Sequence, residues 1–168
     1  AYICIMSTLS VTISETITIN GKDRGSDISL DVENITQVMH RIVSLPADGG
    51  SAATETTVAN FRTAVTTADS AMDDDDVRYI RITNLDASND IHLSLQLAAN
   101  GDADATSQAS IRLNAGTSFI LSKSVGVAAV DDDAAGITAI GSLLDLESII
   151  AVNDNNADGD VEVFIASV

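Results

Sequence analysis

Near its start, the chain alternates apolar and polar side chains at every second position. Serine and threonine fill most positions between the apolar residues, which are Leu9, Val11, Ile13, Ile17 and Ile19. Because successive side chains on a β-strand point to opposite sides, this pattern predicts a strand or hairpin with one buried and one solvated face. Asn20-Gly21 follows directly, and this dipeptide tolerates the positive φ angles of a tight turn.

The same period of two returns in short segments along the rest of the chain. Between residues 34 and 45 the apolar positions fit either a helical stripe or a strand, and we favour a strand over 38–45 because Pro46 would end it. The further strand segments are 28–32, 77–83, 91–97, 111–113, 117–122, 126–130, 137–140, 144–152 and 161–168. Between 58 and 65, Val58, Phe61 and Val65 fit either a short strand or a single helical turn. About eight to eleven short strands at spacings of about ten residues are typical of a sandwich or barrel. The sequence therefore predicts an all-β fold, a single antiparallel β-sandwich of jelly-roll type.

Two of these segments, 77–83 and 91–97, flank a short loop of asparagine, aspartate and serine. Such a loop between two alternating strands predicts a β-hairpin. The length of 168 residues fits one domain that buries about 70% of its unfolded surface. We assign residues 7–168 to this sandwich domain. Residues 1–6 form an N-terminal extension, either the remnant of a processed precursor or the continuation of a chain that starts upstream.

The chain is strongly acidic, with 25 Asp and Glu against 8 Lys and Arg and a net charge of −17. Such a surface repels the phosphate backbone of nucleic acids, and no cluster of basic residues offers a local footprint. Aspartate outnumbers glutamate and favours loops, which agrees with strands joined by many polar turns. No apolar run approaches the ~20 residues that a membrane-spanning helix needs. We therefore expect neither nucleic acid nor a membrane as a partner.

One segment near the C-terminus has the composition of a calcium loop. Oxygen-bearing side chains alternate before a glycine, and the candidate ligands are Asp154, Asn156, Asp158 and Asp160. An EF-hand would need a bidentate glutamate at its twelfth position, where this chain has Ile165. The segment is thus either a Ca²⁺ site of another geometry, which Glu162 could complete, or an Asx-rich turn without metal. We expect no other cofactor.

Two acidic runs, 73–76 and 131–133, place like charges side by side. Such runs are costly when desolvated, so we expect solvated loops, with divalent cations that bridge subunits as the alternative.

Residues suited to catalysis are scarce. Histidine occurs only at His40 and His92, and no spacing of serine, cysteine or histidine is diagnostic of nucleophilic catalysis or of zinc. Tryptophan is absent and aromatic residues make up 3% of the chain, so a stacking platform for sugars or bases would be hard to assemble. We expect no enzymatic activity.

Arg78, Tyr79 and Arg81 share one predicted strand and belong to residue types that are enriched at protein interfaces. They predict either an interface patch or a core aromatic flanked by arginines that reach out to water.

Three stretches of the sequence resemble a pattern in small β-structured virion proteins of tailed bacteriophages, especially marine ones. They are Val-Arg-Tyr-Ile-Arg-Ile-Thr-Asn-Leu-Asp at 77–86, Ile-His-Leu-Ser-Leu at 91–95, and Ile-Arg-Leu-Asn-Ala-Gly-Thr-Ser-Phe-Ile-Leu at 111–121. The segments 16–21 and 41–46 are similar in style. The resemblance implies a component of the capsid surface or tail, one of many copies. Its partners would be other copies of itself and a major capsid or tail protein.

The charge of the chain adds a location to this expectation. A protein this acidic should avoid the DNA-filled interior of a virion and face solvent. We therefore expect a non-enzymatic decoration or cement subunit on the capsid exterior. A phage tail or fibre component is the first alternative. The second is a secreted, calcium-dependent adhesin or carbohydrate-binding module, which would act outside the cell.

Overall fold

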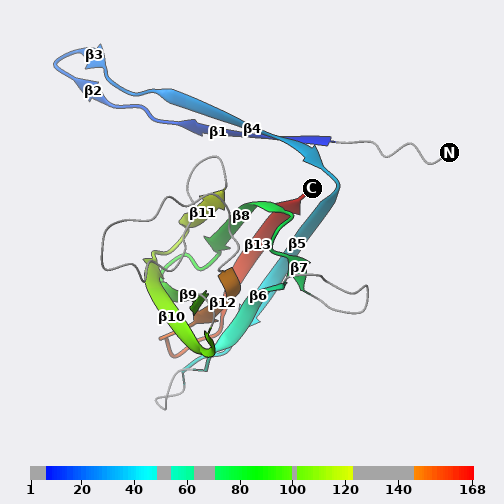
Figure 1. The fold of residues 1–168 in the computed structure, drawn as a ribbon. Helices are drawn as coiled ribbons and strands as arrows, with labels where there is room; N and C mark the ends of the chain where they lie inside the picture. The colour runs from blue at the N-terminus through cyan, green and yellow to red at the C-terminus, as the bar shows by residue number, and fades with distance from the viewer. Residues whose placement is uncertain (1–6, 49–53, 63–70, 100–101, 123–145) are drawn as a thin grey trace, which may run out of the picture.

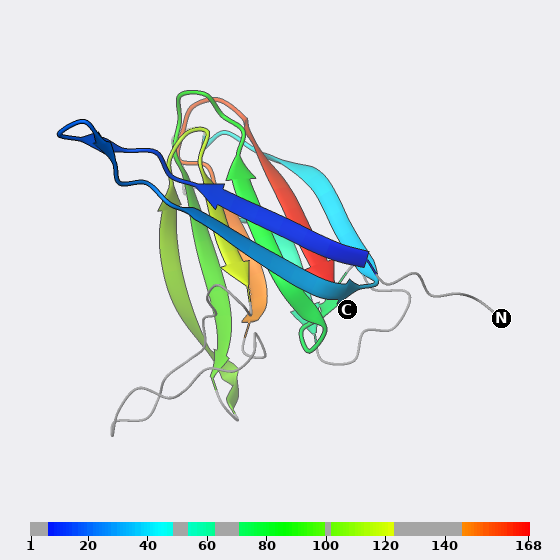
Figure 2. The same ribbon diagram turned by 90° about the horizontal axis from the view of Figure 1, so that it is seen from above.

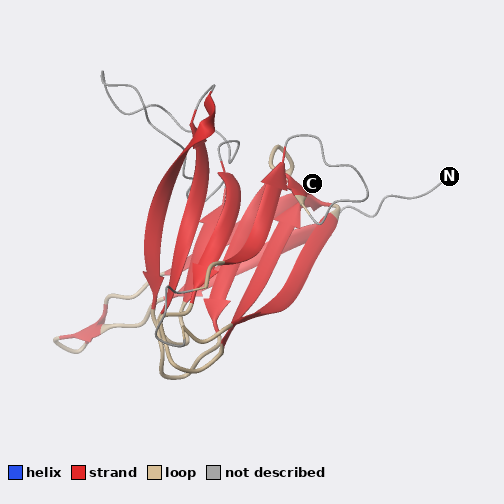
Figure 3. Ribbon diagram, turned by 90° about the horizontal axis from the view of Figure 1, so that it is seen from below, coloured by secondary structure: helices blue, strands red, loops and turns tan. Residues whose placement is uncertain are grey.

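The computed structural model describes residues 7–48, 54–62, 71–99, 102–122 and 146–168 (Figure 1). This part of the chain consists of strands and loops, and Figure 3 shows no helix in it. The strands are β1 (Ser7–Ser14), β2 (Thr18–Ile19), β3 (Lys22–Asp23), β4 (Asp27–Ile35), β5 (Gln37–Leu45), β6 (Thr56–Arg62), β7 (Met72–Asp73), β8 (Val77–Asn84), β9 (Ile91–Ala99), β10 (Asp102–Leu113), β11 (Ser118–Ser122), β12 (Leu146–Val152) and β13 (Gly159–Ser167).

Two sheets form a sandwich. A four-stranded sheet has the order β11-β8-β13-β5, and a five-stranded sheet has the order β10-β9-β12-β6-β7. Without the two-residue β7, the two sheets contain eight strands. If these are renumbered 1 to 8 along the chain from β5 to β13, the four-stranded sheet has the order 6-3-8-1 and the other sheet has the order 5-4-7-2. This is the jelly-roll order. The main pairs are all antiparallel, and the short β6–β7 pair is parallel. The predicted all-β jelly-roll sandwich is therefore confirmed.

The core lies between the two sheets and follows the period of two. On β8 the side chains of Ile80 and Ile82 point inward and are fully buried, as are those of Leu93 and Leu95 on β9. Ile149 on β12 closes the core from the middle of the five-stranded sheet. Each such side chain contributes about 1.5–3 kcal/mol relative to an exposed position. The strand predicted at 38–45 is confirmed as β5, whereas the segments 126–130 and 137–140 lie outside the described residues.

The predicted hairpin of 77–83 with 91–97 is wrong. β8 and β9 belong to opposite sheets, so the loop between them crosses the sandwich. The buried Asn84 holds this crossing, because its Nδ2 donates to the carbonyl oxygens of Asn89 at 2.8 Å and Leu113 at 3.2 Å. A hairpin and a crossover show the same alternation in sequence, since both present one face of each strand to a core. The pairing of the strands distinguishes them, since β8 pairs with β11 and β13 whereas β9 pairs with β10 and β12.

Residues 7–35 form a β-hairpin outside both sheets, which we call the arm. β1 and β4 pair antiparallel, with Val11 opposite Leu30 and Ile13 opposite Ile28. At the tip, Asn20 and Gly21 have φ angles of 52° and 74°, which confirms the turn predicted there. The arm crosses the outer face of the four-stranded sheet, and its tip projects beyond the sandwich (Figures 1 and 2). The predicted domain of residues 7–168 thus contains a sandwich that begins at β5, and residues 1–6 lie outside the described part.

Candidate functional site

The outer face of the four-stranded sheet carries three cross-strand rows of side chains. Register pairing defines the first row as Val38, Ala166, Tyr79 and Ser122. The second row is His40, Phe164, Arg81 and Ile120, and the third is Ile42, Glu162, Thr83 and Ser118. Each row takes one residue from β5, β13, β8 and β11 in turn. This face is the candidate site, because the arm covers part of it and leaves part of it open.

The inner half of the arm packs on the first two rows. Leu9, Val11, Leu30, Val32 and Ile35 contribute its apolar side, and they meet Tyr79, Ile120, Phe164 and Ala166 of the sheet. Tyr79 is only 3% exposed beneath the arm, and its ring meets that of Phe164 edge-on, with centroids 6.0 Å apart. Burial raises the pKa of the Tyr79 hydroxyl, and the nearby charge of Arg81 opposes this in part. The arm is therefore a docked element with an apolar interface of its own.

A charged cluster lies beside this interface. The Oε1 of Glu162 lies 2.8 Å from His40 Nε2, and its Oε2 lies 2.9 Å from Arg81 Nη2. Arg81 Nη1 also donates to Thr83 Oγ1 at 3.0 Å, and the Thr83 hydroxyl lies 2.8 Å from that of Ser118. The hydrogen bond with His40 and the charge of Arg81 lower the pKa of Glu162. These contacts link side chains of all four strands of the sheet, beside the residues on which the arm packs.

The predicted patch of Arg78, Tyr79 and Arg81 does not form one surface. Side chains alternate along β8, so Tyr79 and Arg81 share the outer face while Arg78 does not. The Nη1 of Arg78 donates instead to the carbonyl oxygens of Asp75 at 2.5 Å and of Val77 at 3.1 Å. Tyr79 does belong to an interface, the one between the sheet and the chain's own arm. Neighbouring residues of a strand lie on opposite faces, so a patch can be predicted from sequence only after each side chain has been assigned to a face.

The outer half of the arm remains uncovered. Its isoleucines are exposed, by 38% at Ile13, 51% at Ile17, 51% at Ile19 and 55% at Ile28. Ile13 and Ile28 are register partners and continue the apolar stripe that Val11 and Leu30 begin over the sheet. The prediction of a half-buried strand therefore holds for the inner half of the arm and fails for the outer half, because the arm is longer than the sheet is wide.

A groove of about 420 Å³ runs along β1 on this face. Five consecutive residues, 9–13, line the groove on the side of the arm. Since consecutive side chains of a strand point to opposite faces, the groove must follow the edge of β1. Tyr79, Arg81, Ile120 and Phe164 line it on the side of the sheet. In the described structure β1 pairs with β4 alone, so its second edge faces this groove without a partner strand.

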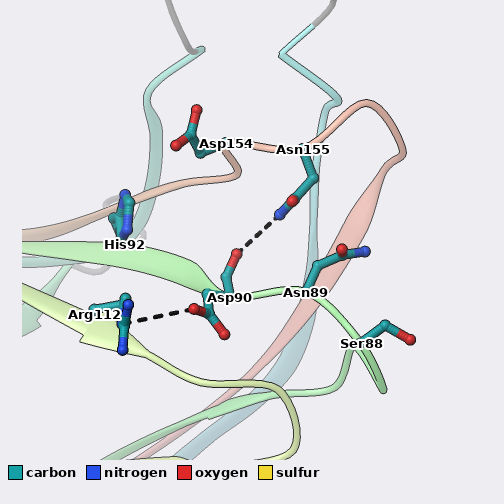
Figure 4. Close-up of a pocket in the computed structure, with 7 residues that line it drawn as sticks. All are labelled: Ser88, Asn89, Asp90, His92, Arg112, Asp154 and Asn155. Atoms are coloured by element: carbon teal, nitrogen blue, oxygen red, sulfur yellow. Dashed lines mark hydrogen bonds and ion pairs between the residues drawn. The ribbon is translucent and has the colours of Figure 1, made fainter.

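A second hollow, of about 450 Å³, lies among the loops at one end of the sandwich (Figure 4). Every side chain that lines it is polar or charged, including His92, Arg112 and Asp90. The Nε of Arg112 lies 3.6 Å from Asp90 Oδ2, and Asn155 Nδ2 donates to the Asp90 carbonyl at 3.0 Å. This second contact ties the β12–β13 loop to the β8–β9 loop. We assign the hollow a structural role as the junction of two crossover loops.

Side chains within these loops satisfy the backbone. Asp86 accepts hydrogen bonds from the backbone N–H groups of Ser88 at 2.7 Å and Asn89 at 2.9 Å, and these bonds lower the pKa of its carboxyl. Asn153 is buried, and its Nδ2 donates to the Ala157 carbonyl at 2.7 Å. Such Asx contacts are the ordinary devices of polar turns.

The four predicted calcium ligands, Asp154, Asn156, Asp158 and Asp160, are all exposed. The Oδ1 of Asp158 already accepts a hydrogen bond from the Ala47 N–H at 2.9 Å. These residues do not form a cluster of possible metal ligands in the described part of the chain. The cluster found there is the run 73–75, whose carboxylate oxygens lie within 4.8 Å of one another. Calcium at 154–160 stays a prediction.

The acidic run 73–76 is part solvated and part buried. Asp75 and Asp76 are exposed, as expected, whereas Asp74 is buried and its pKa is raised by that burial. The second acidic run, 131–133, lies outside the described residues.

Sequence reasoning missed the cluster around Glu162. Its members come from β5, β8, β11 and β13, which lie far apart in the chain. The period of two did place Glu162 on the solvent side of its strand, between Val161 and Val163. Cross-strand register was needed to bring His40 and Arg81 beside it.

No protein-family model matches this sequence, and no curated protein matches it significantly. Among solved structures, the chain has a likeness to the family 11 carbohydrate-binding module of the cellulosomal cellulase Lic26A-Cel5E of Clostridium thermocellum, with 16% identity and a TM-score of 0.28 over 97% of this chain and 86% of that one. A structure of the Clostridium thermocellum family 11 module in complex with a beta-1,3-1,4-mixed-linked tetrasaccharide gives 16% identity and a TM-score of 0.26 over 99% and 90% of the two chains. Scores of this size support no conclusion about ligand or function. Among the described residues, no helix is long and apolar enough to cross a membrane.

Proposed function

We propose that this chain is a non-enzymatic assembly subunit, and specifically a decoration or cement subunit on the capsid exterior of a tailed bacteriophage. One observation supports the assembly role most directly. The outer half of the arm exposes four isoleucines on an element that projects beyond the sandwich. Exposed apolar surface of this kind marks sites of protein association.

The part of the arm that contains β1 also has the charge expected of a contact element. Residues 7–26 contain two acidic residues, Glu15 and Asp23, and two basic residues, Lys22 and Arg24, so their net charge is 2 − 2 = 0. The whole chain carries −17. Copies of so acidic a protein repel one another over a Debye length of about 8 Å at physiological salt, and the neutral segment 7–26 of the arm, which contains β1, is the part that approaches a neighbour at least cost.

The virion location follows from the sequence resemblance and the charge. An acidic subunit on the outside of a shell stays away from packaged DNA, and repeated copies multiply weak contacts into a stable lattice. A tail or fibre location uses the same contacts and is the alternative within this class.

A carbohydrate-binding or adhesin role receives less support from the described residues. Sugar-binding surfaces use exposed aromatic faces. Phe61 and Tyr79 are buried here, Phe119 and Phe164 are partly buried, and no described phenylalanine or tyrosine side chain is exposed. Thermal melting with Ca²⁺ and with a chelator tests this class, because a large shift would favour a calcium-bound module.

The test of the proposed function uses the virion. Electron cryomicroscopy of intact particles should show the jelly roll in a repeated layer outside the shell. Particles depleted of the protein should admit a DNA-binding dye at a lower temperature than intact ones, and purified full-length chain should restore the original temperature. A burst temperature that does not change on depletion would contradict cementing, and density confined to the tail would favour the alternative location.

A further inference from the structure

We propose that two copies of this chain exchange arms, so that the outer half of each arm lies in the groove beside β1 of the other copy. This inference rests on the proposed function as an assembly subunit and names the contact that would perform it. Within each chain, an uncovered apolar arm and an unfilled groove occur on the same face of the same sheet. One two-fold contact would cover both.

The first support is continuity with an interface that already exists. Leu9, Val11, Leu30 and Val32 of the arm pack on the chain's own sheet. The next register pair, Ile13 with Ile28, has the same chemistry but extends past the part of the sheet that the arm covers. An apolar stripe that is buried over half its length and exposed over the rest predicts a second surface of the same kind beneath the exposed half.

The second support is the shape of the receiving surface. The arm packs on Tyr79, Ala166, Ile120 and Phe164 of the first two rows. The β5 end of the face stays open, since Val38 in the first row is 50% exposed and Ile42 in the third row is 64% exposed. The groove lies along the open edge of β1, between that edge and the side chains of Arg81, Ile120 and Phe164. A second two-stranded arm laid there would place its isoleucines against Phe164, Ile120 and the aliphatic part of Arg81.

The third support is the edge of β1 itself. Its eight residues carry no charge and no proline, which are the usual devices that protect an exposed edge strand from pairing. The Glu15 N–H donates to the Ser26 carbonyl, and hydrogen-bonded pairs alternate along an antiparallel ladder. The N–H groups of Ser10 and Thr12 therefore point away from β4 and into the open side. A neighbouring arm could accept hydrogen bonds from them.

Charge selects a second copy as the occupant. Residues 7–26 of the arm are neutral, and its other acidic residues, Asp27, Asp31 and Glu33, lie on β4. Two of these carboxylates are held by β1 side chains, since Asp31 accepts a hydrogen bond from Ser10 Oγ at 2.7 Å and Asp27 accepts one from Ser14 Oγ at 2.5 Å. Two copies of a chain with charge −17 can therefore approach along β1 with the least repulsion. A two-fold axis through paired arms places each tip over the partner's sheet, which gives an isologous and closed contact.

The experiment compares full-length variants by analytical ultracentrifugation. Ile17→Ser with Ile19→Ser removes two exposed side chains from the tip. The control is Ile150→Ser, a single substitution of the same type at a partly buried position on β12 in the opposite sheet. Wild type should be a dimer whose dissociation constant falls as salt screens the repulsion between copies. The tip variant should weaken dimerisation at least about 100-fold, because the two-fold axis doubles each substitution. The control should dimerise like the wild type.

A second measurement does not depend on the tip. Thr12→Pro removes an N–H from the open edge of β1 and leaves the hydrogen bonds to β4 in place. Ser29→Pro makes the matching change on the outer edge of β4, because Ser29 is the register partner of Thr12. The first should abolish the dimer and the second should retain it, with both melting near the wild-type temperature.

A monomeric wild type at every concentration would overturn arm exchange, and so would a tip variant that dimerises normally. Failure of the virion test with an intact arm-dependent dimer would instead overturn only the capsid role. Stabilised particles built from a strictly monomeric protein would leave the capsid role intact and reject the exchange.

Discussion

The docking of the arm on the sheet can be tested at Tyr79. This side chain is 3% exposed, lies between the arm and the sheet, and meets the ring of Phe164. Truncation of a buried aromatic side chain to alanine costs about 3–5 kcal/mol. Because Tyr79 belongs to the cluster under the arm and not to the core between the sheets, Tyr79→Ala should act on the docked arm.

Hydrogen exchange measured by mass spectrometry resolves the two regions. A local loss of about 4 kcal/mol corresponds to about a 10³-fold faster exchange, since each factor of ten takes about 1.4 kcal/mol. We expect this acceleration in peptides from residues 7–35 and little change in β9 and β12. Tyr79→Phe keeps the ring and should behave almost like the wild type.

Ile82→Ala provides the comparison for the core. Ile82 lies on the same strand but is fully buried between the sheets, so its truncation should cost about 2–5 kcal/mol and accelerate exchange throughout the sandwich. If Tyr79→Ala accelerated β9 and β12 as much as the arm, the arm would not be a separable element. Unchanged protection of the arm would show that Tyr79 does not hold it.

Three further predictions concern the crossover, the tip and the charged cluster. Asn84→Asp replaces a donor that serves two carbonyl oxygens with a carboxylate, so urea unfolding at pH 7 should show a loss of about 3 kcal/mol. Burial among carbonyls would raise that carboxyl's pKa, so the loss should shrink as the pH falls; an equal loss at pH 4 would contradict this account. Gly25→Ala would put a Cβ 1.8 Å from the Glu15 carbonyl oxygen, so hydrogen exchange of residues 15–26 should become faster. The increase should exceed that in Gly21→Ala, whose Cβ meets no atom within 4 Å and which costs about 1 kcal/mol for its positive φ. The pKa of Glu162 is lowered chiefly by His40, so Glu162 stabilises the fold above its unfolded pKa near 4.5, and this contribution is lost as the pH falls through the folded pKa. Stability measured from pH 2 to 7 should therefore fall less steeply on the acid side in His40→Ala, and parallel curves would show that the contact with His40 has no effect.

The sequence by itself determined the type of secondary structure and the side of each strand that faces a core. The period of two in 77–83, 91–97 and 161–168 identified the inward residues, such as Ile80, Leu93 and Val163, because alternation along a strand is a local property. The turn at Asn20-Gly21 was predictable for the same reason, since positive φ angles depend on the residues that adopt them. The number and spacing of the segments also predicted a sandwich or barrel, whereas the jelly-roll order is a matter of strand pairing.

Only the tertiary structure decided which strands pair and which apolar faces find a partner. The alternation of β8 and β9 is compatible with one sheet or with two, and the buried contacts of Asn84 across the sandwich select two. Glu162 meets His40 and Arg81 through register between strands that are distant in the chain. In the arm, Val11 and Ile13 follow the same pattern, yet the first packs on the sheet and the second is exposed. A sequence pattern specifies that a face is apolar, and the width of the sheet beneath it determines how much of that face is covered.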